Sequence, residues 1–341
     1  MIDFFRRLFG KTAPPALTQP VMSDMTTAVP APAKIPTAQT IEKPAGVWSP
    51  DKNFNELYVK WLLSEHLGAS SPYVEKTILS GLEKLRQSDL AASQLLPRVP
   101  TVLLQVLKSL RDSNVSANDL AQQISKDVSL VAELLHEVNG AYYSPINRVT
   151  SLDSAIQLLG FNGLRMLIAR TAFRPIIQTQ SGQLAKELAP VIWEHSEKTS
   201  LACQLLAQKT QLDSFHAFLA GLLQNVGLMI AFRLVDRTGV TEKLPMSDSF
   251  QAAFFKQALL LTLHVGKQWE FPEKVLLAIA KKHNDVEQNS ELAVCLQQAD
   301  QLARFRLLVN HGVITEADAV GLLPRGSDLL ACFHQLNKAQ A

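Results

Sequence analysis

Two adjacent amide side chains, Gln224 and Asn225, stand in the middle of a strongly apolar stretch that runs from Phe215 to Leu234. Apolar residues would fall on all sides of a helix in this stretch, so we expect one helix that is buried all round. A buried amide destabilises a fold unless its polar atoms find hydrogen-bond partners. The pair therefore marks either a chemical site or the remains of one.

No other motif in the sequence offers competing chemistry. There is no Gly-rich phosphate loop, no Gly-x-Ser-x-Gly and no His-Glu-x-x-His. The cysteines Cys203, Cys295 and Cys332 lie far apart, without a Cys-x-x-Cys pair, which argues against a disulfide framework and a zinc cluster. We interpret each as a small buried hydrophobe in a reducing cytoplasm.

The composition indicates a helical protein with a large core. The chain has 341 residues, of which 47% are hydrophobic, and Leu, Ala and Gln are abundant while β-branched alternation is scarce. The 33 basic and 31 acidic residues give a net charge of +2, so no nucleic-acid partner is predicted. No uninterrupted apolar run reaches about 18 residues, so no membrane-spanning helix is predicted either.

The first 50 residues of the chain differ from the rest. Residues 1–11 form a short amphipathic segment, which is either a weak interfacial tether to a membrane or partner, or a frayed terminus; we favour the frayed terminus. A tether would place the cytoplasmic protein at the periphery of the inner membrane. Residues 12–50 contain eight prolines and predict a disordered, semi-extended linker.

Helix signals recur from there to the C-terminus. Ser71-Pro72 is typical of a helix start, and Ser116 with Asp119 predicts a capping box. Gly160 is expected to stop a helix that begins at Ser151, with a turn over 161–163. Further helices are expected over 54–67, 73–90, 130–138, 164–173, 186–209, 250–269, 273–283 and 292–308.

Four signatures then occur in order: a Leu-Pro-x-x-Pro entry at 96–100, ISKDVSL at 124–130, NGAYY at 139–143 and AIQLLG at 155–160. Together they resemble the HD-related output domain (HDOD) family of bacteria, over about residues 91–285. The resemblance implies an all-α, two-lobed fold related to the HD phosphohydrolases. In those enzymes histidines and aspartates bind a divalent metal ion that acidifies a water for attack on phosphorus.

The resemblance also assigns positions around the former metal site. His195 corresponds to the first ligand, Gln224-Asn225 to the His-Asp dyad and Asp300 to the later aspartate, while His264 and His283 correspond to auxiliary histidines. Two neutral amides in the dyad make a poor transition-metal site. We therefore expect these positions to surround one vestigial cavity held together by hydrogen bonds, with no catalytic residue, no metal ligand and no cofactor.

Each of these residues also has a purely structural interpretation. Taken alone, the histidines would be core or solvated side chains, the amides would cross-link helices and Asp300 would lie on a helix surface. Arg165, Arg170 and Arg174 could line an anion-binding or partner-binding groove at the junction of the lobes, although a solvated helix face is the favoured interpretation.

The sequence thus predicts an HDOD domain over 91–310, with lobes at about 91–179 and 181–310. Residues 51–90 are expected to be a helical extension and 311–341 a C-terminal helical tail. The predicted function is a non-catalytic bacterial signal-transduction module that binds a protein partner or a small signal. The alternative is a metal-dependent phosphohydrolase or phosphodiesterase that uses His195, His264, His283 and Asp300 in place of the dyad.

Overall fold

The computed structural model describes residues 52–69, 71–88, 95, 104–105, 108, 116–125, 128–140, 143, 145–178, 182–240, 243–245, 247–282 and 290–338. The amphipathic segment 1–11, the linker 12–50 and His283 lie outside the described residues. The predictions made for them stay predictions.

The described chain confirms the all-α class. Its strands are two short segments, β1 (Leu67–Gly68) and β2 (Leu244–Pro245), which pair in parallel. The helices of the first part are α2 (Lys52–Leu63), α3 (Pro72–Gln87), α5 (Ala117–Ile124), α6 (Val128–Val138) and α7 (Leu152–Gln178). The helices of the second part are α8 (Gln183–Ala207), α9 (Ser214–Leu223), α10 (Val226–Thr238), α11 (Asp248–Gln268), α12 (Glu273–Lys281), α13 (Glu291–Asn310), α14 (Glu316–Gly321) and α15 (Asp328–Lys338).

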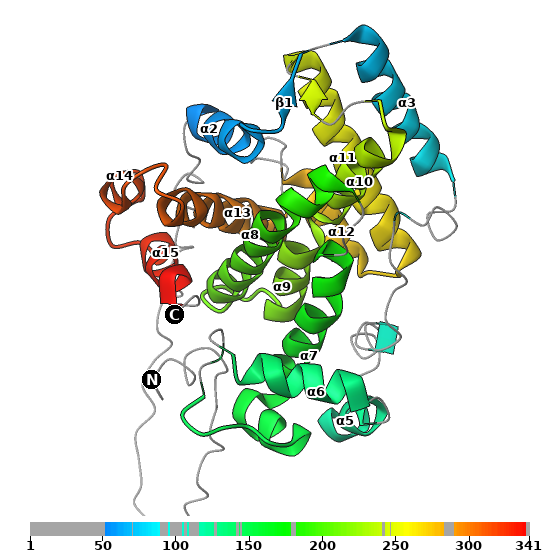
Figure 1. The fold of residues 1–341 in the computed structure, drawn as a ribbon. Coiled ribbons are helices and arrows are strands. Elements are labelled where there is room, and N and C mark those ends of the chain that lie inside the picture. Colours follow the sequence, from blue (N-terminus) through cyan, green and yellow to red (C-terminus); the bar gives the residue numbers. More distant parts are fainter. Residues whose placement is uncertain are drawn as a thin grey trace, which may run out of the picture.

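A first lobe is built from α5, α6 and the start of α7 (Figure 1). The predicted capping box opens α5: Asp119 N–H donates to Ser116 Oγ at 3.1 Å, and Ser116 N–H donates to Asp119 Oδ2 at 2.9 Å. Beyond the end of α6, the Asn139 amide pairs with both backbone groups of Val149 at 2.8 Å. These bonds fix the return of the chain into α7.

Helix α7 joins the two lobes. Gly160 has φ 69°, a left-handed conformation that favours glycine and that breaks the helix, as the sequence predicted. The predicted turn over 161–163 is wrong, because the chain resumes helical geometry directly after Gly160. The second part also continues past Phe173 and through Pro175 to Gln178.

The second lobe packs around α8, which contacts α7, α9, α10, α13 and α15. The prediction of a single helix over 215–234 is wrong, because α9 ends at Leu223 and α10 begins at Val226, with Gln224 and Asn225 in the break. The predicted burial is confirmed. The stretch Ser214–Thr238 is long and apolar enough to cross a membrane, but 89% of its most apolar window is buried inside the protein, as in the core helix of many globular domains.

The segments that flank the predicted domain pack onto this lobe. Helix α3 lies against α10 and α11, and β1 joins β2 beside it. Helix α2 lies by α13, and α14 and α15 close the other side of α13 (Figure 1). The α15 carbonyl of Phe333 accepts a 3.1 Å hydrogen bond from the buried guanidinium of Arg306 in α13.

Candidate functional site

Asp300 of α13 is the centre of a buried polar cluster in the second lobe. Its Oδ1 lies 3.0 Å from His195 Nε2 and accepts a 3.1 Å hydrogen bond from Gln224 Nε2. Its Oδ2 lies 2.8 Å from an Arg304 nitrogen and 3.6 Å from Lys282 Nζ. Asn225 joins through His195, so the structure brings together four of the six positions predicted from the sequence. They are in direct contact rather than arranged around a void.

The chemistry of the neighbours fixes which way the Gln224 amide points. Lys282 Nζ can only donate, and it lies 2.5 Å from Gln224 Oε1. The ionised Asp300 can only accept, so it faces the amide NH2. Gln224 therefore links a cation to an anion, a role that an apolar residue in the same place could not fill.

Each ring nitrogen of His195 lies close to a polar side chain, Nε2 to Asp300 and Nδ1 to Asn225. The Ser196 hydroxyl donates to the Ile192 carbonyl, so its oxygen accepts from Asn225 Nδ2 at 3.0 Å. Asn225 Nδ2 also lies 3.3 Å from His195 Nδ1. With the Asn225 amide in this orientation Nδ1 accepts, which assigns the ring proton to Nε2, the nitrogen that faces Asp300. Burial lowers the pKa of His195 below its ordinary value, although Asp300 opposes this, and so favours the neutral ring.

Asp300 stays ionised because of its cationic neighbours. Burial alone would raise the pKa of its carboxyl, but Arg304, Lys282 and His195 together hold it well below its usual range. Burial also lowers the pKa of Lys282, and the charge of Asp300 counteracts that effect. Two cations therefore face one carboxylate in this cluster.

The break between α9 and α10 positions the two amides. Thr262 Oγ1 of α11 accepts from the Gly227 N–H at 3.0 Å, and its hydrogen is shared between the carbonyls of Gln224 and Ala258, each at 3.2 Å. Its hydroxyl thus replaces regular helix bonds at the break. The helices approach so closely that a Cβ on Gly227 would lie 2.0 Å from the Ala258 carbonyl oxygen. This contact explains the glycine that comes after the amide pair.

Sequence reasoning missed three residues of the cluster: Lys282, Arg304 and Tyr58. Arg304 lies four residues after Asp300 in one helix, a spacing that could have predicted their ion pair. Lys282 is the C-cap residue that follows α12, next to His283 in the sequence, and no local signal reveals where its Nζ points. Tyr58 comes from α2, outside the predicted domain, and its ring centroid lies 5.2 Å from that of His195.

The arrangement of these helices can be compared with known proteins. The family model of the HDOD domain matches residues 96–285, more than half of the sequence. The chain belongs to the HDOD family. Another HDOD domain protein, from Geobacter sulfurreducens, has a similar fold with a TM-score of 0.54, at 21% identity over 77% of this chain and 94% of that one.

Two further comparisons assign no specific activity. A Shewanella amazonensis SB2B protein, named provisionally as a metal-dependent phosphohydrolase, shares the fold with a TM-score of 0.54. It is 18% identical over 79% of this chain and all of that one, which speaks for the fold alone. An uncharacterized protein of Treponema pallidum (strain Nichols) is 26% identical over 205 residues, 55% of this chain, and the match spans 38% of that protein's length.

The remaining predicted site residues lie elsewhere or outside the described residues. His264 is half-buried on α11, and within the described chain no hydrogen bond or ion pair joins it to Asp300 or His195. The four-residue ligand set of the enzymatic alternative is therefore represented in the cluster by His195 and Asp300. His283 is not described.

The three predicted arginines do not form one basic groove. Arg165 lies over the ring of Phe161, 4.1 Å from its centroid. Arg170 is buried between Glu137 of α6 and Glu197 of α8, to which its Nε donates at 2.7 Å. Arg174 is about half exposed and donates to Glu137 at 3.0 Å.

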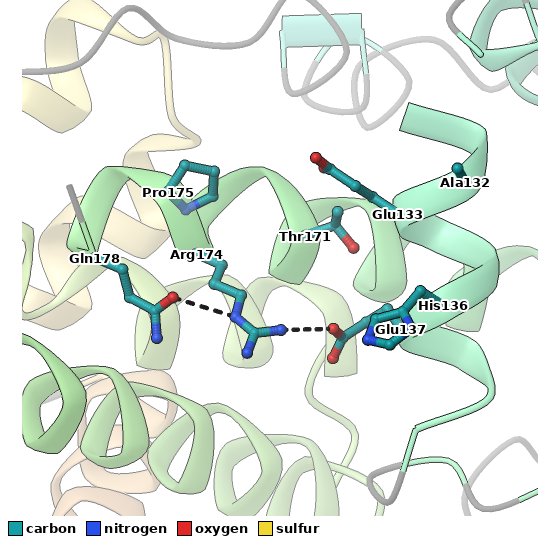
Figure 2. Close-up of a pocket in the computed structure, with 8 residues that line it drawn as sticks. All are labelled: Ala132, Glu133, His136, Glu137, Thr171, Arg174, Pro175 and Gln178. Carbon is teal, nitrogen blue, oxygen red and sulfur yellow. Dashed lines mark hydrogen bonds and ion pairs between the residues drawn. The ribbon is translucent and has the colours of Figure 1, made fainter. Parts of the chain in front are cut away.

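Arg174 also lines a hollow of about 520 Å³ between α6 and α7, in which it reaches across to Glu137 (Figure 2). The other lining residues are Ala132, Glu133, His136, Thr171, Pro175 and Gln178. Carboxylates accompany the arginine here, so the hollow offers an anion little net positive charge. It contains none of the residues of the Asp300 cluster.

Proposed function

We propose that this HDOD chain is a non-catalytic signalling or regulatory module of the bacterial cytoplasm, which acts by binding a protein partner or a small signal. The observation that carries the proposal is the charge of the Asp300 cluster. In an HD-type hydrolase, carboxylates and free imidazole nitrogens would hold a divalent cation and tune its bound water. Here Lys282 and Arg304 supply the positive charge that faces the single carboxylate.

The donor atoms support the same conclusion. A divalent metal ion needs deprotonated, uncommitted ligands, and its own charge would repel two nearby cations. His195 has its Nδ1 lone pair toward Asn225, and Gln224 has its oxygen toward Lys282. The residues of the cluster therefore do not fit a hydrolytic metal centre, and we assign no step of catalysis to them.

Elemental analysis tests the non-catalytic part of the proposal. We expect the full chain, purified after expression in medium supplemented with manganese, iron and nickel, to contain substoichiometric metal. His195→Ala should leave that content unchanged, and so should the control His264→Ala. A stoichiometric metal in the wild-type chain that is lost in His195→Ala would overturn the proposal.

Two designed variants sharpen this test. Gln224→His with Asn225→Asp restores the residue types of the dyad but leaves the Lys282 ammonium beside Asp300, so we expect no tight manganese binding. Adding Lys282→Ala removes that cation, and the triple variant should bind manganese measurably by isothermal titration calorimetry. Equal manganese affinity in the two variants would show that Lys282 does not stand in for a metal ion.

The binding part of the proposal needs a separate experiment. Affinity capture with the tagged full chain, followed by mass spectrometry, should recover one reproducible protein or small anionic signal.

Membrane contact by residues 1–11 is tested by sedimentation with anionic vesicles. The full chain is compared with a variant that lacks this segment. Sedimentation that is unchanged by the deletion would rule this contact out.

A further inference from the structure

Helix α2 covers the Asp300 cluster with two polar-tipped side chains. The Tyr58 ring packs on His195, with 5.2 Å between the ring centroids, and Asn55 Oδ1 accepts a 2.8 Å hydrogen bond from Arg304. The Arg304 guanidinium also lies 5.0 Å from the centroid of the Tyr58 ring. Residues that are distant in the chain are therefore joined at this place, and α2 separates the cluster from water.

Two further aromatic contacts come from the face of α2 that carries Tyr58. The rings of Phe54 and Phe305 are 4.6 Å apart between centroids, and those of Trp61 and His311 are 4.9 Å apart. Phe54, Tyr58 and Trp61 are spaced by four and three residues, the pattern with which an amphipathic helix binds in a groove. Helix α2 thus packs on the second lobe through three aromatic side chains on one face, together with the buried Leu62 and Leu63 near its C-terminal end.

The docked position contains an uncompensated polar group. Tyr58 is 3% exposed, and its hydroxyl is buried without a hydrogen-bond partner among the described residues. A buried hydroxyl without a hydrogen-bond partner destabilises the docked position, and it forms hydrogen bonds with water once the helix undocks. The ion pairs and amide bonds beneath it link α8, α12, α13 and the α9–α10 break, so they do not depend on α2.

We propose that α2 is a displaceable strap with two positions. Docked, it covers His195, Asp300 and Arg304; undocked, it exposes them to water or to a binding partner while the rest of the lobe stays folded. The proline-rich residues 12–50 lead directly into α2 in the sequence, so a partner that holds them would act on the strap at its first turn. The strap concerns the same cluster as the proposed function but does not require that the cluster be non-catalytic.

Hydrogen exchange of the full chain, followed by mass spectrometry, tests the strap. Amides of α2 should exchange through a local opening, at least about tenfold faster than the slowest amides of α8 and α13 once intrinsic rates are removed. Tyr58→Ala should speed α2 exchange by a further factor of about ten and leave the slowest amides of α8 nearly unchanged. Tyr73→Ala is the matched control, because Tyr73 on α3 is 72% exposed.

One result would overturn the strap whatever the metal analysis shows. If α2 amides are as protected as those of α8, and Tyr58→Ala accelerates both equally, α2 opens only when the lobe unfolds. Diethylpyrocarbonate labelling gives a second measurement on the folded protein. Tyr58→Ala should increase modification of His195 about tenfold over wild type, whereas unchanged modification would show that α2 does not control access to the cluster.

Discussion

Two buried charged clusters lie on different sides of helix α8, and their charges are balanced in different ways. His195 and Glu197 are two residues apart, so they point to different sides of the helix, one toward Asp300 and the other toward Arg170. Around Arg170, two carboxylates meet two arginines and the charges balance. Around Asp300, one carboxylate lies beside two cations, and the neutral amide of Gln224 bonds to the same carboxylate.

The difference shows how much depends on a single group in each cluster. At the lobe junction, loss of one ion pair leaves others in place, because Glu137 contacts both Arg170 and Arg174. In the Asp300 cluster, Asp300 is the acid of both ion pairs, those with Lys282 and Arg304. We therefore expect the clusters to respond differently to neutralisation, and three substitutions measure that difference.

The largest effect is expected from Asp300→Asn. The substitution leaves Lys282 and Arg304 buried without their counter-ion, a situation that typically costs about 3–5 kcal/mol. Urea unfolding at pH 7 would measure the loss. Asp328→Asn is the control, because the Asp328–Lys209 pair is 3.8 Å long and largely exposed. A loss of stability in the control as large as that in Asp300→Asn would contradict the prediction.

Arg170→Met should have the next largest effect, about 3 kcal/mol at pH 7, because Glu137 and Glu197 lose their shared buried cation. Burial raises the pKa of Glu197, and Arg170 counteracts the increase. A raised carboxyl pKa means that the folded state binds the proton more tightly than the unfolded state, so this group's contribution to stability falls as pH rises from about 4.5 through the folded pKa.

The substitution should therefore become less costly in acid. Without Arg170, the pKa of Glu197 rises further, and the variant gains more stability on acidification than the wild type does. Unfolding curves at pH 7 and pH 5 measure the difference between the two proteins at each pH. A cost that is constant or larger at pH 5 would contradict this account of Glu197.

Arg174→Ala should have the smallest effect, at most about 0.5 kcal/mol. Arg174 contacts the same Glu137 as Arg170, but its side chain is 47% exposed, so water and salt screen the pair. The measurement is again urea unfolding at pH 7. A loss equal to that of Arg170→Met would mean that the junction is one cooperative network rather than a buried pair with an exposed neighbour.

Much of the fold could be predicted from local patterns. The capping box at Ser116, the glycine stop at Gly160 and the proline-started helix at Ser71-Pro72 are short-range signals, and each appears in the structure. The single helix over 215–234 could not be corrected locally, because the break depends on the hydroxyl of Thr262, in another helix. Apolar periodicity reports burial, not the partners that interrupt a helix.

The candidate site, too, could be predicted in part from the sequence and in part only from the tertiary structure. The sequence determined by itself that Gln224 and Asn225 would be buried amides that require partners, and family resemblance pointed to His195 and Asp300. Only the tertiary structure decided that Lys282 and Arg304 supply the positive charge and that Tyr58 covers it. The reason is physical: a residue's type limits which bonds it can make, whereas the helices that surround it decide which of those bonds are within reach.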